Sequence, residues 1–196
     1  MTKENNVLGF LIIIVVSFGF MFYNIFHLLS QIKVVEEQSM NWKQNYEQCI
    51  SKEAFNQSKQ EVIVQNIQNL RPRLDKSVVN DYANLIQKYC PEGVQTHMVA
   101  IIEQESGYNP GAKNHNDYGL GQINYSTWKK FFEIKNPRVL LDSATNIRLS
   151  CKILHMAYVS HSDHPKWYAF YHSWNSVPQK IYIKKIDKIL KGLKNE

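Results

Sequence analysis

The chain has 196 residues and a mass of 23.0 kDa, with 23 Lys and Arg against 17 Asp and Glu and a net charge of +6. This length allows one ordinary domain with an attached segment, and a hydrophobic fraction of 44% argues against general disorder. The charge is uneven, because residues 1–70 hold 5 basic and 6 acidic side chains while residues 71–196 carry a net +7. A single soluble globule over the whole chain is therefore disfavoured.

The first segment, residues 1–29, is predicted to be a transmembrane helix that anchors the chain. No Asp, Glu, Lys or Arg lies between Glu4 and Lys33, and residues 7–26 are almost entirely large and apolar. About 20 such residues suffice to cross a bilayer as a helix. A cleaved signal peptide with its apolar region at 7–16 is the competing interpretation, but the apolar residues continue to Phe26. The flanking charges do not decide the orientation.

The second segment, residues 30–72, is predicted to be a helical stalk. It contains no glycine and no proline before Pro72 and is rich in polar residues, which allows a helix up to about 60 Å long. Apolar or aromatic side chains recur at heptad spacing, which points to self-association through residues 30–60: Ile32, Val35, Trp42, Tyr46 and Cys49. Fewer than three apolar heptads favour the alternative, a helix that partly rests on the next domain. The residue before a proline is pushed out of helical geometry, so Arg71–Pro72 marks the boundary.

The third segment, residues 73–196, is predicted to be a mainly α-helical domain. Apolar periodicity and stop signals place helices at 77–89, 94–106, 144–159, 167–174 and 179–193. Gly107 is suited to the left-handed position that ends the second of these helices. No alternating stretch is long enough to predict a strand.

One carboxylate in this domain is placed where chemistry is expected. At 100° per residue, Glu105 falls on the apolar stripe of Met98, Ile101 and Ile102, whereas Glu103 points to the opposite side. Burial raises the pKa of a carboxyl group, and a general acid must be protonated near neutral pH. The alternative is a glutamate at a helix end that reaches solvent or pairs with a lysine.

Two motifs surround this glutamate. The first is Glu105-Ser106-Gly107-Tyr108-Asn109-Pro110, and the second, about a dozen residues later, is Gly119-Leu120-Gly121-Gln122-Ile123-Asn124. Together they resemble the soluble lytic transglycosylase (SLT) family, whose catalytic domain is similar to goose-type lysozyme. A third segment, Ser173-Trp174-Asn175-Ser176 with Tyr182 after it, resembles the family's third motif less closely.

The resemblance implies a lysozyme-like α-helical fold and a peptidoglycan substrate. Glu105 would be the catalytic acid and base that cleaves the bond between N-acetylmuramic acid and N-acetylglucosamine and forms a 1,6-anhydro product. The implied substrate-binding residues are Ser106, Gly119, Leu120, Gln122, Asn124, Trp174, Asn175 and Tyr182, with the two glycines of the second motif letting the backbone approach the sugar. Neither a metal nor a cofactor is implied.

Three residues depart from the family pattern. Trp174 replaces a tyrosine whose hydroxyl bonds the glutamate, Val177 stands where glycine is common, and Gly121 stands where methionine is common. Asp117 is a second carboxylate just before the second motif, which leaves two interpretations open. It could cap a loop, or it could activate water and make the enzyme a true lysozyme.

The remaining features bear on location and partners. Cys90 and Cys151 are expected either to form a disulfide or to be buried thiols, and Cys49 lies on the stalk. The +7 charge fits a polyanionic cell wall, and no nucleic-acid recognition motif is found. We expect a single-pass membrane protein with its enzyme outside the cytoplasm or on a virion membrane. Wall turnover, a secretion or conjugation apparatus and phage entry all remain open as settings, as does a catalytically weak wall-binding role.

Overall fold

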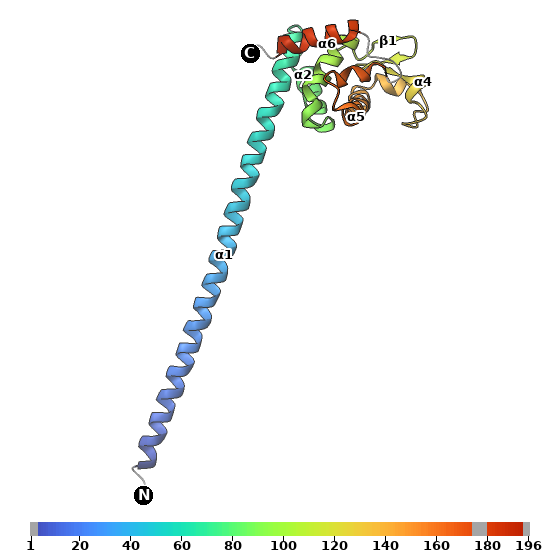
Figure 1. Cartoon of the computed structure of the whole chain (residues 1–196). Coiled ribbons are helices and arrows are strands. Elements are labelled where there is room, and N and C mark those ends of the chain that lie inside the picture. The colour runs from blue at the N-terminus through green and yellow to red at the C-terminus, as the bar shows by residue number, and fades with distance from the viewer. Residues whose placement is uncertain (1–3, 174–179, 194–196) are drawn as a thin grey trace. The chain divides into compact units, whose positions relative to one another are not determined.

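The computed structural model describes residues 4–173 and 180–193, with side chains from residue 18 onward. The chain divides into two compact units, residues 1–55 and 56–196. The first unit lies in the long helix α1 (Glu4–Leu70), which the absence of glycine and proline between Gly19 and Pro72 favours (Figure 1). On it, Trp42 and Tyr46 stack with ring centroids 5.4 Å apart, and Cys49 is an exposed free thiol.

The predicted transmembrane helix is not supported by the described residues. Within them, no helix combines the length and the apolarity needed to cross a membrane. The apolar run that motivates the prediction covers residues 7–26, and the side chains of residues 7–17 lie outside the described part. The anchor therefore stays a prediction from the sequence.

The second unit starts earlier than the boundary expected at Arg71–Pro72. Its first element is the end of α1 from Asn56, where Ile63 and Ile67 are 4% and 0% exposed and belong to the hydrophobic core. Helix α1 does end at Leu70, as the proline signal predicts. The last turns of the expected stalk are thus part of the folded domain.

The rest of the unit is mainly helical. Its helices are α2 (Lys76–Tyr89), α3 (Gln95–Ser106), α4 (Tyr125–Trp128), α5 (Ser143–His161) and α6 (Lys180–Leu193), with 3₁₀ turns η1 (Glu92–Val94), η2 (Pro137–Leu141) and η3 (Trp167–Tyr171). The predicted helices at 77–89, 94–106, 144–159 and 179–193 agree with α2, α3, α5 and α6 within a few residues, except that residue 179 lies outside the described part. In the segment predicted as a helix at 167–174, the structure has the 3₁₀ turn η3 over Trp167–Tyr171.

A small antiparallel sheet was not predicted. Its strands are β1 (Lys113–Asn114), β2 (Asp117–Tyr118) and β3 (Ile123–Asn124), in the order β1-β2-β3. Residues Asp117 and Tyr118 pair with Asn124 and Ile123. Two-residue strands are too short to produce a detectable alternation of apolar and polar side chains. The sheet and α4 lie together in the unit (Figure 1).

The core is built around α3. Its residues from Met98 to Ile102 are all 0% exposed, so this helix is covered on nearly every side. Helix α6 packs on α3, and α5 packs on both α2 and η3. A disulfide joins Cys90, at the end of α2, to Cys151 in α5, which decides between the two alternatives for these cysteines.

Candidate active site

Glu105 lies in the last turn of the central helix α3. The apolar stripe before it is buried, as the periodicity predicts, and the Glu105 side chain itself is half-buried. Gly107 ends the helix in the left-handed conformation with φ of 59°. The Ser106 hydroxyl donates to the carbonyl of Ile102 at 3.2 Å, so this side chain bonds its own helix and does not line the cleft described below.

The environment of Glu105 favours its protonated form. Burial raises the pKa of this carboxyl group from 4.5 to about 7, against a hydrogen-bonding influence of the Tyr182 hydroxyl; the charge of Asp117 raises it further and Lys185 lowers it. In the same way, burial and the charge of Glu105 raise the pKa of Tyr182 well above its usual range. Neither Glu105 Oε1 nor the buried Tyr182 hydroxyl has a partner with good hydrogen-bond geometry among the described residues. A buried carboxyl oxygen without such a partner favours the neutral form of the acid.

Glu105 opens into a cleft of about 330 Å³. Besides Glu105 the lining contains two carboxamides, one further carboxylate and several aromatic or apolar side chains: Asp117, Gln122, Ile123, Asn124, Thr127, Trp128, Ile153, Tyr171, His172 and Ser173. We call this space the catalytic cleft. Polar groups that converge on a partly apolar hollow are typical of a site for a polar ligand such as a sugar.

The two glycines of the second motif serve packing rather than an approach to the cleft. A Cβ on Gly119, whose φ is 74°, would lie 2.2 Å from the carbonyl oxygen of Leu140. A Cβ on Gly121 would lie 2.1 Å from Ser150 Oγ and 2.5 Å from the hydroxyl of Tyr171. The sequence suggested that these glycines make room for the sugar. In the structure they instead allow close contact with the core. Between them, Leu120 is 0% exposed and belongs to that core.

A buried polar network holds this motif in place. Asn146 of α5 donates to the carbonyls of Tyr118 and Leu140 at 2.8 and 2.7 Å and accepts from the Gly121 N–H at 2.8 Å. The Tyr171 hydroxyl donates to the Gly121 carbonyl at 2.7 Å. Buried networks with every member bonded are rigid, so the segment between β2 and β3 is fixed to α5.

Gln122, in the connection before β3, and Asn124, in β3, complete the wall of the cleft. Gln122 has a left-handed φ of 46°, and its Nε2 donates to the carbonyls of Gly119 and Ala112 at 2.9 and 3.1 Å. The Asn124 amide donates to Asp117 Oδ1 at 2.8 Å, and its own oxygen caps α4. The Asp117 carboxylate lines the cleft, accepts from Asn124 and raises the pKa of Glu105, so both interpretations of Asp117 stay open.

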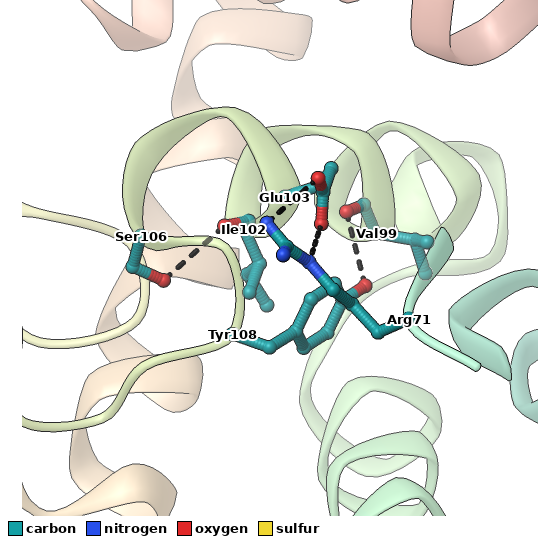
Figure 2. A network of polar contacts seen from close by, with 6 residues as sticks. All are labelled: Arg71, Val99, Ile102, Glu103, Ser106 and Tyr108. Carbon is teal, nitrogen blue, oxygen red and sulfur yellow. Dashed lines mark hydrogen bonds and ion pairs between the residues drawn. The ribbon is translucent and has the colours of Figure 1, made fainter. Parts of the chain in front are cut away.

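The opposite side of α3 is held by an ion pair. Arg71 donates from Nε and Nη2 to the two carboxylate oxygens of Glu103 at 2.7 and 2.9 Å (Figure 2). The guanidinium also covers Gly107, since a Cβ there would lie 2.2 Å from Nη2. The Tyr108 hydroxyl donates to the carbonyl of Val99 at 3.1 Å (Figure 2). These contacts fix the end of α3 that carries the acid.

The third motif is described only in part. Trp174 and Asn175 lie outside the described residues, as does Val177, whereas Ser173 lines the cleft and Tyr182 faces Glu105 from α6. The ring of His172 also lines the cleft and stacks on Tyr182 with centroids 4.6 Å apart.

Sequence reasoning did not single out Trp128, Thr127 or His172 as part of the site. Trp128 follows the second motif by four residues, which is a signal that could have identified it. Asn146, a polar residue within the apolar helix α5, is a signal for the network that holds the motif. In the part of the chain that the structure describes, no group of three or more His, Cys, Asp or Glu side chains could hold a metal ion.

Comparison with known proteins agrees with this geometry. The family model "Transglycosylase SLT domain" matches residues 85–187, more than half of the chain, and this range includes the acid, the sheet and Tyr182. No curated protein and no solved structure matches the chain. At the level of the family, the domain indicates peptidoglycan cleavage of the lytic transglycosylase type. The chain therefore belongs to the transglycosylase SLT domain family.

Proposed function

We propose that residues 56–196 act as a lytic transglycosylase that cleaves the bond between N-acetylmuramic acid and N-acetylglucosamine in peptidoglycan. The observation that carries this proposal is Glu105, a carboxyl group with a pKa of about 7 whose Oε1 is buried at the catalytic cleft without a partner among the described residues. A carboxyl group of this kind is protonated in a large fraction of molecules at neutral pH.

In the proposed reaction, Glu105 first donates its proton to the glycosidic oxygen, and the bond from that oxygen to C1 of the muramic acid breaks. The C6 hydroxyl of the same sugar then attacks C1, and its proton passes to the Glu105 carboxylate. The products are a free N-acetylglucosamine end and a 1,6-anhydro end, and the acid is regenerated without water. One carboxyl group suffices because the substrate supplies the nucleophile.

The neighbours of Glu105 support this role. The Tyr182 hydroxyl and Lys185 stabilise the carboxylate in the second half of the reaction, since both lower its pKa. Gln122 and Asn124 line the cleft and offer amide groups to the acetamido and hydroxyl groups of the sugars. Ser106, Gly119 and Leu120 would act by holding these residues in place, and the roles of Trp174 and Asn175 remain expectations from the motif.

A second candidate is a true lysozyme that hydrolyses the same bond. It is favoured by Asp117, which lines the catalytic cleft together with Glu105 and acts on its pKa. A second carboxylate on the same cleft is what an inverting or retaining glycosidase needs to activate water or to act as nucleophile.

Mass spectrometry of the products from purified peptidoglycan decides between the two. A lytic transglycosylase gives anhydro ends, which lack one water relative to the reducing ends that a hydrolase gives. We expect anhydro ends from the wild type and from Asp117→Asn. Reducing ends from the wild type, lost in Asp117→Asn, would establish the lysozyme instead. Glu105→Gln, with folding intact, should release no soluble fragments. If the wild-type chain binds peptidoglycan but also releases no fragments, the protein is a wall-binding protein and not an enzyme.

The proposed location is outside the cytoplasmic membrane, with residues 1–29 as the anchor and residues 30–60 as a region of self-association. The support is the apolar run at 7–26, the exposed Trp42 and Tyr46, and a substrate that lies outside that membrane. Membrane fractionation followed by protease treatment of intact spheroplasts tests the location. Recovery of the full chain in the soluble fraction, or protection from protease, would contradict it.

A further inference from the structure

A second groove lies next to the catalytic cleft. Its volume is about 530 Å³, within the range of roughly 300–1,000 Å³ that ligand sites have. The segment after α4, the turn η2 and one face of α5 line it: Phe131, Phe132, Glu133, Ile134, Lys135, Asn136, Val139, Thr145, Arg148, Leu149 and Lys152. We call it the Phe131 groove.

The groove and the catalytic cleft are lined by residues that contact one another. Trp128 lines the cleft, and its ring stacks on Phe132 of the groove with centroids 5.4 Å apart. Helix α5 contributes to both, with Ile153 on the cleft and Lys152 on the groove. A substituent on a molecule in the cleft is therefore expected to extend toward the groove past Trp128.

The chemistry of the groove differs from that of the cleft. Phe131 and Val139 leave 61% and 45% of their surface exposed, which gives it an apolar floor. Arg148 and Lys152 lie one turn apart on α5 and are exposed, and Lys135 joins them from the loop. Within the described residues none of these three cations is in an ion pair, and Glu133 is the one acid of the lining. The groove thus combines apolar surface with available positive charge.

We propose that the Phe131 groove binds the acidic peptide that the muramic acid carries. This inference rests on the proposed function, because it takes peptidoglycan as the substrate. The peptide carries free carboxylates and short aliphatic side chains, which match the cations and the apolar floor, whereas an uncharged glycan offers no group for the cations. Since the peptide is attached to the sugar in the cleft, its effective concentration at the groove is high and weak contacts suffice.

The test uses Glu105→Gln protein, so that binding is measured without cleavage. The two ligands are glycan strands that keep their peptides and strands from which an amidase has removed them, with the lactyl carboxyl groups that the amidase frees converted to methylamides so that the stripped strands carry no charge. In this background, Arg148→Ala combined with Lys152→Ala should weaken binding to the peptide-bearing strands about threefold to tenfold, as expected for two exposed ion pairs. Binding to the stripped strands should not change.

The matched control is Lys184→Ala combined with Lys188→Ala. These side chains are exposed on α6, outside the groove, and their removal changes the net charge by the same amount. If the control variant loses as much affinity for the strands as the groove variant does, the effect comes from overall charge and the proposal is overturned. An equal loss on both ligands in the groove variant, or no loss, also overturns it.

Activity separates this inference from the proposed function. In protein that keeps the wild-type Glu105, the groove variant should lower kcat/KM on peptide-bearing strands by a similar factor and leave kcat/KM on the stripped strands unchanged. Selective binding without any cleavage by the wild type would reject the transglycosylase and retain the peptide site. Cleavage of both ligands with no selectivity between variants would retain the enzyme and reject the site.

Discussion

Glu105 has its unusual proton affinity because of its position on α3. The same helix turn carries Glu103, whose charge is stabilised by Arg71, while Glu105 faces the core side and is desolvated. Two acids of one type, two residues apart, thus lie in different surroundings because the helical period places them on different sides of α3.

Replacing Glu105 by glutamine is expected to stabilise the protein at high pH. The folded pKa of about 7 exceeds the usual 4.5, so the stability linked to protonation is fully present below pH 4.5 and is lost as pH rises through 7. The difference in unfolding free energy between Glu105→Gln and the wild type should be near zero at pH 4.5 and should grow to about 3 kcal/mol in favour of the variant at pH 8. Urea unfolding at several pH values measures it. A difference that does not change with pH contradicts the raised pKa.

The rate of cleavage should fall on the alkaline side of neutrality. Only protonated Glu105 can start the reaction, so kcat/KM should decrease about tenfold per pH unit above the pKa near 7. Asp117→Asn removes a charge that raises this pKa, and the alkaline limb should therefore move to lower pH. Turbidity of peptidoglycan suspensions across pH 5–9 provides the profile. If the alkaline limb of the Asp117→Asn profile stays at the wild-type pH, Asp117 does not influence the pKa of Glu105.

At the scale of elements, the sheet segment depends on contacts with α5 that are distant in sequence. Gly121→Ala should destabilise the protein by about 1–3 kcal/mol, because the new methyl group meets the buried Ser150 and Tyr171 side chains. Gly192→Ala is the control, since nothing lies within 4 Å of its Cβ position and alanine favours the helix by up to about 1 kcal/mol. Thermal unfolding compares the two variants. Equal midpoints would mean that the segment relaxes away from α5.

The sequence predicted what depends on local periodicity and could not predict what depends on contacts between distant segments. Helices α2, α3, α5 and α6 and the buried face of Glu105 follow from the spacing of apolar residues. The network of Asn146 with Gly121 and the place of Asp117 in the cleft depend on contacts between segments far apart in the chain. The glycines of the second motif illustrate the limit, because a sequence shows that a Cβ is missing but not which atom takes its space.

At the scale of the whole molecule, the folded unit needs the end of α1. A fragment of residues 56–196 should unfold cooperatively, whereas residues 73–196 should be less stable by about 3–6 kcal/mol, because Ile63 and Ile67 leave the core. This loss is comparable to the whole stability of many domains, about 5–15 kcal/mol. Urea unfolding of both oxidised fragments, followed by circular dichroism, measures the difference. Equal stability of the two fragments would place the domain boundary at Pro72.

The Arg71–Glu103 ion pair has a mechanical consequence. Arg71 directly follows the last residue of α1, and Glu103 precedes the acid by two residues on α3 (Figure 2). A torque applied to the last turns of α1 would therefore be transmitted to the turn that carries Glu105 through the two charge-assisted hydrogen bonds of this ion pair. The end of α1 within the folded unit is thus coupled directly to the helix end that carries the acid.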